Sequence, residues 1–289
     1  MSDNYLLPPF IERMVKSADL LVFPAVGAQL VPFMNKPIEQ KNLVQIIEQD
    51  PGLTATLLRN INAASVPVAK EICSIERAVN ILGTRQSFAI AFTQIISTQL
   101  RSTATSVKTT LFLDFWRRSL LTALFAERLD ARLQTGIENA YTLGLLYHLG
   151  MILMLESYGD YYIGQMRSVG TDLDKLIEKE REHYETDFEH VGHWVMSKWG
   201  FPASILDPLH PDTPSTESTR QVIIIAAEIA NRCLSFEYGE NALSAMPSES
   251  IDLLLDPTTS PNPAFDPAFH DWYQEIILGI RETLSSTKS

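Results

Sequence analysis

Cysteine is scarce in this sequence: only Cys73 and Cys233 occur among 289 residues, far apart and without a C-x-x-C spacing. This scarcity argues against a disulfide framework and against a thiolate metal site. The first ten residues, MSDNYLLPPF, have neither a basic segment nor a long apolar one, so no export signal is expected. We therefore expect a cytoplasmic protein that folds in a reducing environment.

Long apolar runs and an excess of basic residues are also missing. The strongest apolar run, Val222 to Ala227, is far shorter than a membrane-spanning helix requires. Lys and Arg number 23 against 35 Asp and Glu, and the resulting net charge of -12 repels phosphate backbones and anionic lipid headgroups. We expect no nucleic-acid partner and no membrane partner, whereas an acidic surface suits partner proteins with basic patches.

Motifs of two common enzyme classes are absent as well. The sequence contains no Gly-x-Ser-x-Gly, the motif that carries a nucleophilic serine, and no glycine-rich loop that could cradle a phosphate. What it does contain is 45% hydrophobic residues over a length that is ample for a buried core.

The first half of the chain carries well-marked helix ends. Asp50 is placed to cap a helix that begins at Pro51, where the missing N–H costs nothing. Ser74 predicts the start of a second helix and Gly83 its end, and Thr84 begins a third that we expect to run to about Ile96. No stretch here alternates with period two, so the sequence predicts an all-α fold.

The second half continues the helical pattern. We expect a long helix over 111–135, one central helix over 140–157 with Gly144 and Gly150 as close-packing positions, and a charged surface helix over 172–185. Thr186 and Glu189 predict a capping box for the next helix, which ends near Gly200. We expect a buried helix over 220–236 and a terminal helix over 271–284. The polar stretch 101–110 suggests a connection between two packed helical lobes, residues 1–110 and 111–289.

Three segments in order resemble the HDOD (HD-related output domain) family over about residues 20 to 235. They are IIEQDPGLTATLLRNINAAS with SIERAVNILG, then GLLYHLGMILM, then DFEHVGHWVMSKWGFPASI. The resemblance implies an N-terminal helical bundle followed by a degenerate HD-like lobe. It also implies descent from HD-type phosphohydrolases, in which His and Asp residues hold divalent metals that activate water.

The residues at the expected metal positions depart from that ancestral pattern. By the resemblance, Arg118 stands where the first His would be, Tyr147 and His148 replace the His-Asp pair, and Met151 replaces a Lys. The remaining candidates for this relic site are His190, His210 and Glu228. Since a guanidinium offers no lone pair and a tyrosine is a poor ligand at neutral pH, we expect no catalytic residue and no resident metal.

Each of these residues also has a plain structural interpretation. Tyr147 and His148 suit a hydrogen-bonded position in an apolar core, and His190 and His193 suit the partly exposed side of a helix. Arg118 could pair with Glu228 and supply a fixed positive charge in place of the metal, or it could be a surface arginine. Both interpretations of Arg118 stay open at this point.

Three functional hypotheses follow. The first is a bacterial regulator that acts in trans, through protein contacts or a small ligand, on signalling proteins of two-component or cyclic-dinucleotide pathways. The second is a metal-dependent phosphohydrolase that uses His148, His190, His210 and Glu228. The third is a nucleotide sensor that binds through Arg118 without hydrolysis. The sequence makes no prediction of the oligomeric state.

Overall fold

The computed structural model describes residues 23–34, 36–63, 72–103, 109–214 and 217–235, and every regular element in these ranges is helical. The predicted all-α class is therefore confirmed for this part of the chain. The elements are α2 (Ala25–Leu30), the 3₁₀ turn η2 (Val31–Phe33), α3 (Gln40–Glu48), α4 (Pro51–Ala63), α5 (Ile75–Leu82), α6 (Thr84–Thr103), α7 (Thr109–Leu133), α8 (Ala140–Tyr147), α9 (Leu149–Tyr158), α10 (Asp160–Val169), α11 (Leu173–Tyr184), α12 (Phe188–Lys198), α13 (Ala203–Leu206) and α14 (Ser218–Ser235).

The helix ends in the first half follow the local signals. One carboxylate oxygen of Asp50 accepts the backbone N–H groups of Gly52 at 2.7 Å and Leu53 at 3.0 Å, and so caps α4. Gly83 ends α5 with a φ of 81°, a left-handed conformation that favours glycine. Helix α6 runs on to Thr103, well past the predicted end at Ile96, so part of the expected connection at 101–110 is helical.

The expected single central helix over 140–157 is wrong, because the chain breaks at His148 into α8 and α9. His148 has φ -89° and ψ 8°, outside the helical region, and the bond from Met151 N–H to its carbonyl spans three residues instead of four. The apolar pattern continues through the break because both helices are buried on all sides. Hydropathy alone therefore could not reveal it.

Two glycines allow the central helices to approach closely. A Cβ atom on Gly144 of α8 would lie 2.7 Å from the Thr122 carbonyl oxygen of α7. One on Gly150 of α9 would overlap the carbonyl oxygen of Phe188 and lie 2.8 Å from the nitrogen of Gly192, both in α12. The prediction that Gly144 and Gly150 are close-packing positions is confirmed.

The start of α12 differs from the predicted capping box. Asp187, and not Thr186, is the N-cap, and its carboxylate accepts the backbone N–H of His190 at 2.9 Å. Glu189 does not return to the cap, because its carboxylate is bound inside the protein to Tyr147 and Arg220. The predicted end of the helix holds, since Gly200 has a φ of 73°.

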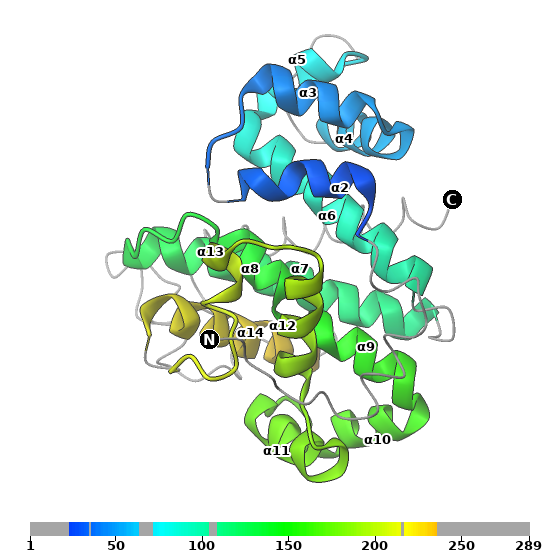
Figure 1. The fold of residues 1–289 in the computed structure, drawn as a ribbon, viewed down its shortest axis with the longest axis vertical. Coiled ribbons are helices and arrows are strands. Elements are labelled where there is room, and N and C mark those ends of the chain that lie inside the picture. Colours follow the sequence, from blue (N-terminus) through cyan, green and yellow to red (C-terminus); the bar gives the residue numbers. More distant parts are fainter. Residues whose placement is uncertain (1–22, 35, 64–71, 104–108, 215–216, 236–289) are drawn as a thin grey trace, which may run out of the picture.

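Figure 1 shows α2 to α5 at one end of the molecule and α10 and α11 at the other, with α7, α8, α9, α12 and α14 between them. Phe23, before α2, stacks on Trp199 at 4.9 Å and touches Phe201 at 5.4 Å between ring centroids, so the residue just before α2 packs on the end of α12. No described helix has the length and apolar character to cross a membrane. The predicted terminal helix at 271–284 lies outside the described residues.

Candidate functional site

A cavity of about 300 Å³ lies between α7, α9, α10, α11 and α14. This volume is at the lower end of the range of about 300–1,000 Å³ that is typical of small-molecule sites. Most of its wall is apolar. The apolar lining residues are Leu111, Phe115, Met151, Leu155, Ile163, Met166, Val169, Leu173 and Leu176.

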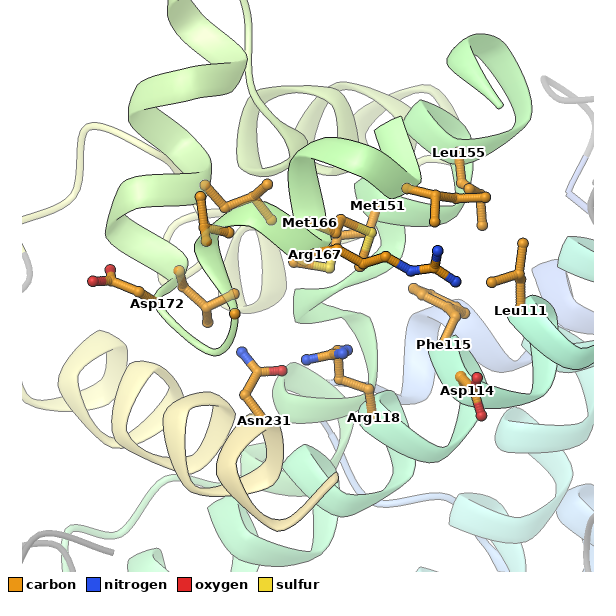
Figure 2. Close-up of a pocket in the computed structure, with 15 residues that line it drawn as sticks. Leu111, Asp114, Phe115, Arg118, Met151, Leu155, Met166, Arg167, Asp172 and Asn231 are labelled. Atoms are coloured by element: carbon orange, nitrogen blue, oxygen red, sulfur yellow. The ribbon is translucent and has the colours of Figure 1, made fainter. Parts of the chain in front are cut away.

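Three polar side chains extend into this cavity (Figure 2). Arg118 comes from the middle of α7, Asn231 from α14 and Arg167 from the last turn of α10. Asn231 is 1% exposed, and neither its amide nitrogen nor its amide oxygen has a hydrogen-bond partner among the described residues. The sequence left Arg118 open between a residue facing the former metal position and a surface arginine; in the structure it lines the cavity.

Tyr147 belongs to a buried hydrogen-bonded network, which agrees with the structural interpretation given for it as the alternative to a relic-site role. The Tyr147 hydroxyl donates to one carboxylate oxygen of Glu189 at 2.8 Å, and the Arg220 guanidinium donates to the other at 2.7 Å. All three side chains are buried, so α8, α12 and α14 are tied together by one ion pair and one hydrogen bond to the same carboxylate. Burial, and then the neighbouring Glu189 charge, raise the pKa of Tyr147 far above its ordinary value.

A second buried carboxyl group lies on α11. Glu180 accepts the Tyr162 hydroxyl through one oxygen and the Phe188 backbone N–H, at 2.8 Å, through the other. Burial raises the pKa of Glu180 to about 8, although both hydrogen bonds act in the opposite direction. Glu180 is therefore largely protonated at neutral pH and links α10, α11 and the start of α12.

His148 sits at the break between α8 and α9 and is fully buried. Its ring stacks on Phe188 at 6.2 Å, and neither ring nitrogen has a hydrogen-bond partner among the described residues. Burial, followed by the positive charge of Arg118, lowers the pKa of His148 well below its ordinary value. The imidazole is thus neutral and lies in the core as expected, but among the described residues it lacks the hydrogen bond that was also expected.

The other predicted relic residues are dispersed and do not line the cavity. His190 places its Nδ1 2.9 Å from both carboxylate oxygens of Asp187. His210 lies in the loop after α13, with its ring 4.5 Å from that of His193. Burial, and then the positive charge of His210, lower the pKa of His193 to about 4. Glu228 lies on α14 one helical turn before Asn231. Its predicted pairing with Arg118 stays a prediction.

The donor set does not fit a catalytic divalent metal. Such a centre needs several imidazole or carboxylate ligands converging on one point. Within the described ranges, no group of three or more His, Cys, Asp or Glu residues is close enough to hold an ion. The Tyr147 hydroxyl is bound to Glu189, and Arg118 offers only hydrogen-bond donors.

Sequence reasoning missed four residues that shape this region: Arg167, Asn231, Glu189 as an ion-pair partner, and Arg220. A signal existed for Asn231, because it lies three positions after Glu228 on the same helical face. No comparable signal marked Arg167 or the Glu189–Arg220 pair, since both depend on how distant helices pack.

Comparison with known proteins gives a family match over most of the chain. The HDOD domain matches residues 20–212. No curated protein matches the sequence.

Solved structures share the fold at low sequence identity. An HDOD domain protein of unknown function from Geobacter sulfurreducens has a TM-score of 0.65 at 19% identity, with 96% of each chain covered. A Shewanella amazonensis protein, provisionally named a phosphohydrolase, has a TM-score of 0.58 at 20% identity, covering 96% of this chain and 93% of its own. A Marinobacter aquaeolei protein, provisionally named a signal transduction protein, has a TM-score of 0.67 at 17% identity, covering 97% of this chain and 65% of its own.

Proposed function

The chain belongs to the HDOD domain family, and from this premise we propose that it is a non-catalytic regulatory module of signal transduction. It acts through contacts with partner proteins or by sensing a small ligand. One observation supports the proposal: the residues that the resemblance assigns to the ancestral ligand positions are a guanidinium, a hydrogen-bonded tyrosine and a buried neutral histidine. Arg118, Tyr147 and His148 together do not provide the ligands that an activating metal would need.

The names of two structural neighbours point in different directions. One is provisionally named a signal transduction protein and another a phosphohydrolase. At 17% and 20% identity neither decides the activity of this chain. The donor set described above favours the regulatory alternative.

We also propose a two-part organisation, with residues 1–110 as an N-terminal helical lobe and 111–289 as a degenerate HD-like lobe. Packing supports this division: α3, α4, α5 and α6 contact one another, while α7 contacts α8 and α14, and α9 contacts α12. The proposed partners are signalling proteins of two-component or cyclic-dinucleotide pathways. The net charge of -12 favours partners whose contact surface is basic.

The test is elemental analysis of metal in protein purified without a chelator, combined with assays of phosphomonoesterase and phosphodiesterase activity. We expect less than one tenth of an equivalent of iron, manganese or zinc, and no phosphate release above a heat-inactivated sample. Near-stoichiometric metal that is lost in His190→Ala, but kept in the exposed-histidine control His183→Ala, would overturn the proposal. That result would support the metal-dependent phosphohydrolase instead.

A further inference from the structure

The cavity between α7, α9, α10, α11 and α14 has an apolar inner wall and a charged rim. The lining residues with buried side chains are Phe115, Met151, Leu155, Leu173, Leu176 and Asn231. The charged lining residues are more accessible to solvent: Asp114 and Arg167, which are exposed, and Arg118 and Asp172, which are partly exposed. The formal charges of these four cancel, so the lining favours an uncharged occupant over an ion.

Asn231 supplies the polar side chain of the buried part of this wall. It extends into the cavity from α14 and is 1% exposed (Figure 2). Neither its amide nitrogen nor its amide oxygen has a hydrogen-bond partner among the described residues. An asparagine amide holds a donor and an acceptor side by side, and buried amides are normally hydrogen-bonded. A group that binds beside Asn231 should therefore present an acceptor and a donor side by side as well.

A water molecule is a poor partner for this amide. An ordered water in a protein interior needs two to four polar partners, whereas the other buried side chains of the lining are apolar. An amide group on a ligand satisfies Asn231 through both atoms at once. The ligand carbonyl accepts from the Asn231 amide nitrogen, and the ligand N–H donates to the Asn231 amide oxygen.

The remaining buried side chains suit an aromatic body. Phe115 offers a ring for stacked or edge-on contact, and Met151 provides a flexible thioether that adapts to the shape of a ligand and contacts aromatic rings favourably. A volume of about 300 Å³ favours a compact molecule over an extended one.

We propose that this cavity binds a compact, uncharged aromatic amide, whose carboxamide or lactam edge pairs with Asn231 while its ring packs against Phe115 and Met151. The proposal rests on the regulatory function proposed above and names the chemistry of the small ligand that is sensed. A site built to hydrogen-bond a polar group rejects an analogue that lacks it, because the buried partner is then left unpaired. A ketone of the same shape as the amide should therefore bind much more weakly.

The experiment measures calorimetric binding and thermal stabilisation of the purified full chain in the presence of EDTA. The probes are benzamide and 2-pyridone, compared with acetophenone, which has the shape of benzamide without its N–H groups, and with benzoate, which carries a charge. We expect an amide to bind at least about tenfold more tightly than acetophenone, and benzoate to bind more weakly than benzamide. At a hundredfold excess over its Kd, the amide should raise Tm by about 5 °C. Tighter binding of benzamide supports a primary carboxamide ligand, and tighter binding of 2-pyridone a lactam.

Variants locate the site at Asn231. Asn231→Leu removes the amide at nearly constant size and should reduce the affinity ratio of amide to ketone to about one. It should also keep or raise the Tm of the ligand-free protein, because it removes a buried amide without a partner among the described residues. Asn231→Ala repeats the test with a smaller side chain in case leucine lowers Tm. Gln221→Leu, at an exposed amide of the same helix, is the matched control and should leave the ratio unchanged.

The outcomes distinguish this proposal from the one it rests on. Absence of saturable amide binding, or an amide-to-ketone ratio that persists in both Asn231→Leu and Asn231→Ala, overturns the ligand site and leaves a regulator that acts through protein contacts. Benzoate binding more tightly than benzamide also overturns the site, because it shows recognition of charge. Amide binding together with phosphate release that depends on added manganese supports the ligand site and overturns the non-catalytic function.

Discussion

Neutralising Glu189 tests the buried network that joins α8, α12 and α14. Glu189→Gln keeps the shape of the side chain and its ability to accept the Tyr147 hydroxyl, but it removes the negative charge opposite Arg220. Arg220 cannot lose its proton to compensate, because the guanidinium stays charged in proteins. The variant therefore leaves a positive charge buried without a counter-ion.

The expected cost follows from the burial of both partners. Breaking a buried ion pair by removing one partner typically costs about 3–5 kcal/mol. Only one guanidinium nitrogen of Arg220 is bound to Glu189, and the other two have no hydrogen-bond partner among the described residues. We therefore place the loss at about 3 kcal/mol, a large part of the roughly 5–15 kcal/mol that stabilises an ordinary domain.

Urea denaturation, followed by tryptophan fluorescence at pH 7, measures this free energy of unfolding. The double variant Glu189→Leu with Arg220→Met removes both charges together and should recover at least half of the loss, because an apolar pair needs no counter-ion. Glu182→Gln is the matched control at an exposed glutamate of α11, and it should change stability by less than about 0.5 kcal/mol.

Two results would refute this reasoning. The first is a cost below about 1 kcal/mol for Glu189→Gln, since that would place the pair in water-like surroundings. The second is a double variant less stable than the single one, which would mean that the network provides shape and hydrogen bonding that apolar side chains cannot replace.

Three further perturbations have defined outcomes. Because burial raises the pKa of Glu180 to about 8 from an ordinary 4.5, between these values the native state keeps a proton that the unfolded chain loses, so the unfolding free energy should fall from about pH 5 to about pH 8 and level off above it. Glu180→Gln should flatten that slope in urea titrations, and an unchanged slope would contradict the assignment. Gly150→Ala should cost about 3 kcal/mol or more through its clash with α12, whereas Gly164→Ala, in open space on α10, should be neutral or stabilising by differential scanning calorimetry. Asp187→Ala should cost at least about 1–2 kcal/mol, because it removes the N-cap and also the ion pair with Arg181, whereas Thr186→Ala should cost less than about 0.5 kcal/mol. The reverse order in urea melts would restore the predicted capping box.

The sequence predicts helix ends well where the signal is local. Asp50, Ser74 and Gly83 act on backbone groups within a few residues of themselves, so their side-chain chemistry is sufficient. The predicted cap at Thr186 was wrong because Asp187 binds the N–H group that Thr186 was expected to bind, and because Glu189 has a partner from another helix. The prediction of one continuous helix through His148 was wrong because α8 and α9 are both buried on every side, so the hydropathy pattern shows no interruption.

The candidate site was predictable only in part for a similar reason. The family resemblance singled out Arg118, and Arg118 lines the cavity; its equivalence to an ancestral metal ligand stays a prediction. Asn231 and Arg167 come to the same cavity from helices far along the chain. A hydropathy pattern indicates which face of each helix is buried, but not which faces meet.

The contact between Gly150 and α12 has a mechanical consequence. Two backbones touch there without an intervening side chain, so no rotamer change can absorb a displacement of one helix relative to the other. Met151, the next residue, lines the cavity. A displacement of α9 at Met151 would therefore pass directly to α12, whose outer side carries the half-exposed rings of His193 and Trp194. Gly150 would thus couple the wall of an internal cavity to the exterior of the protein.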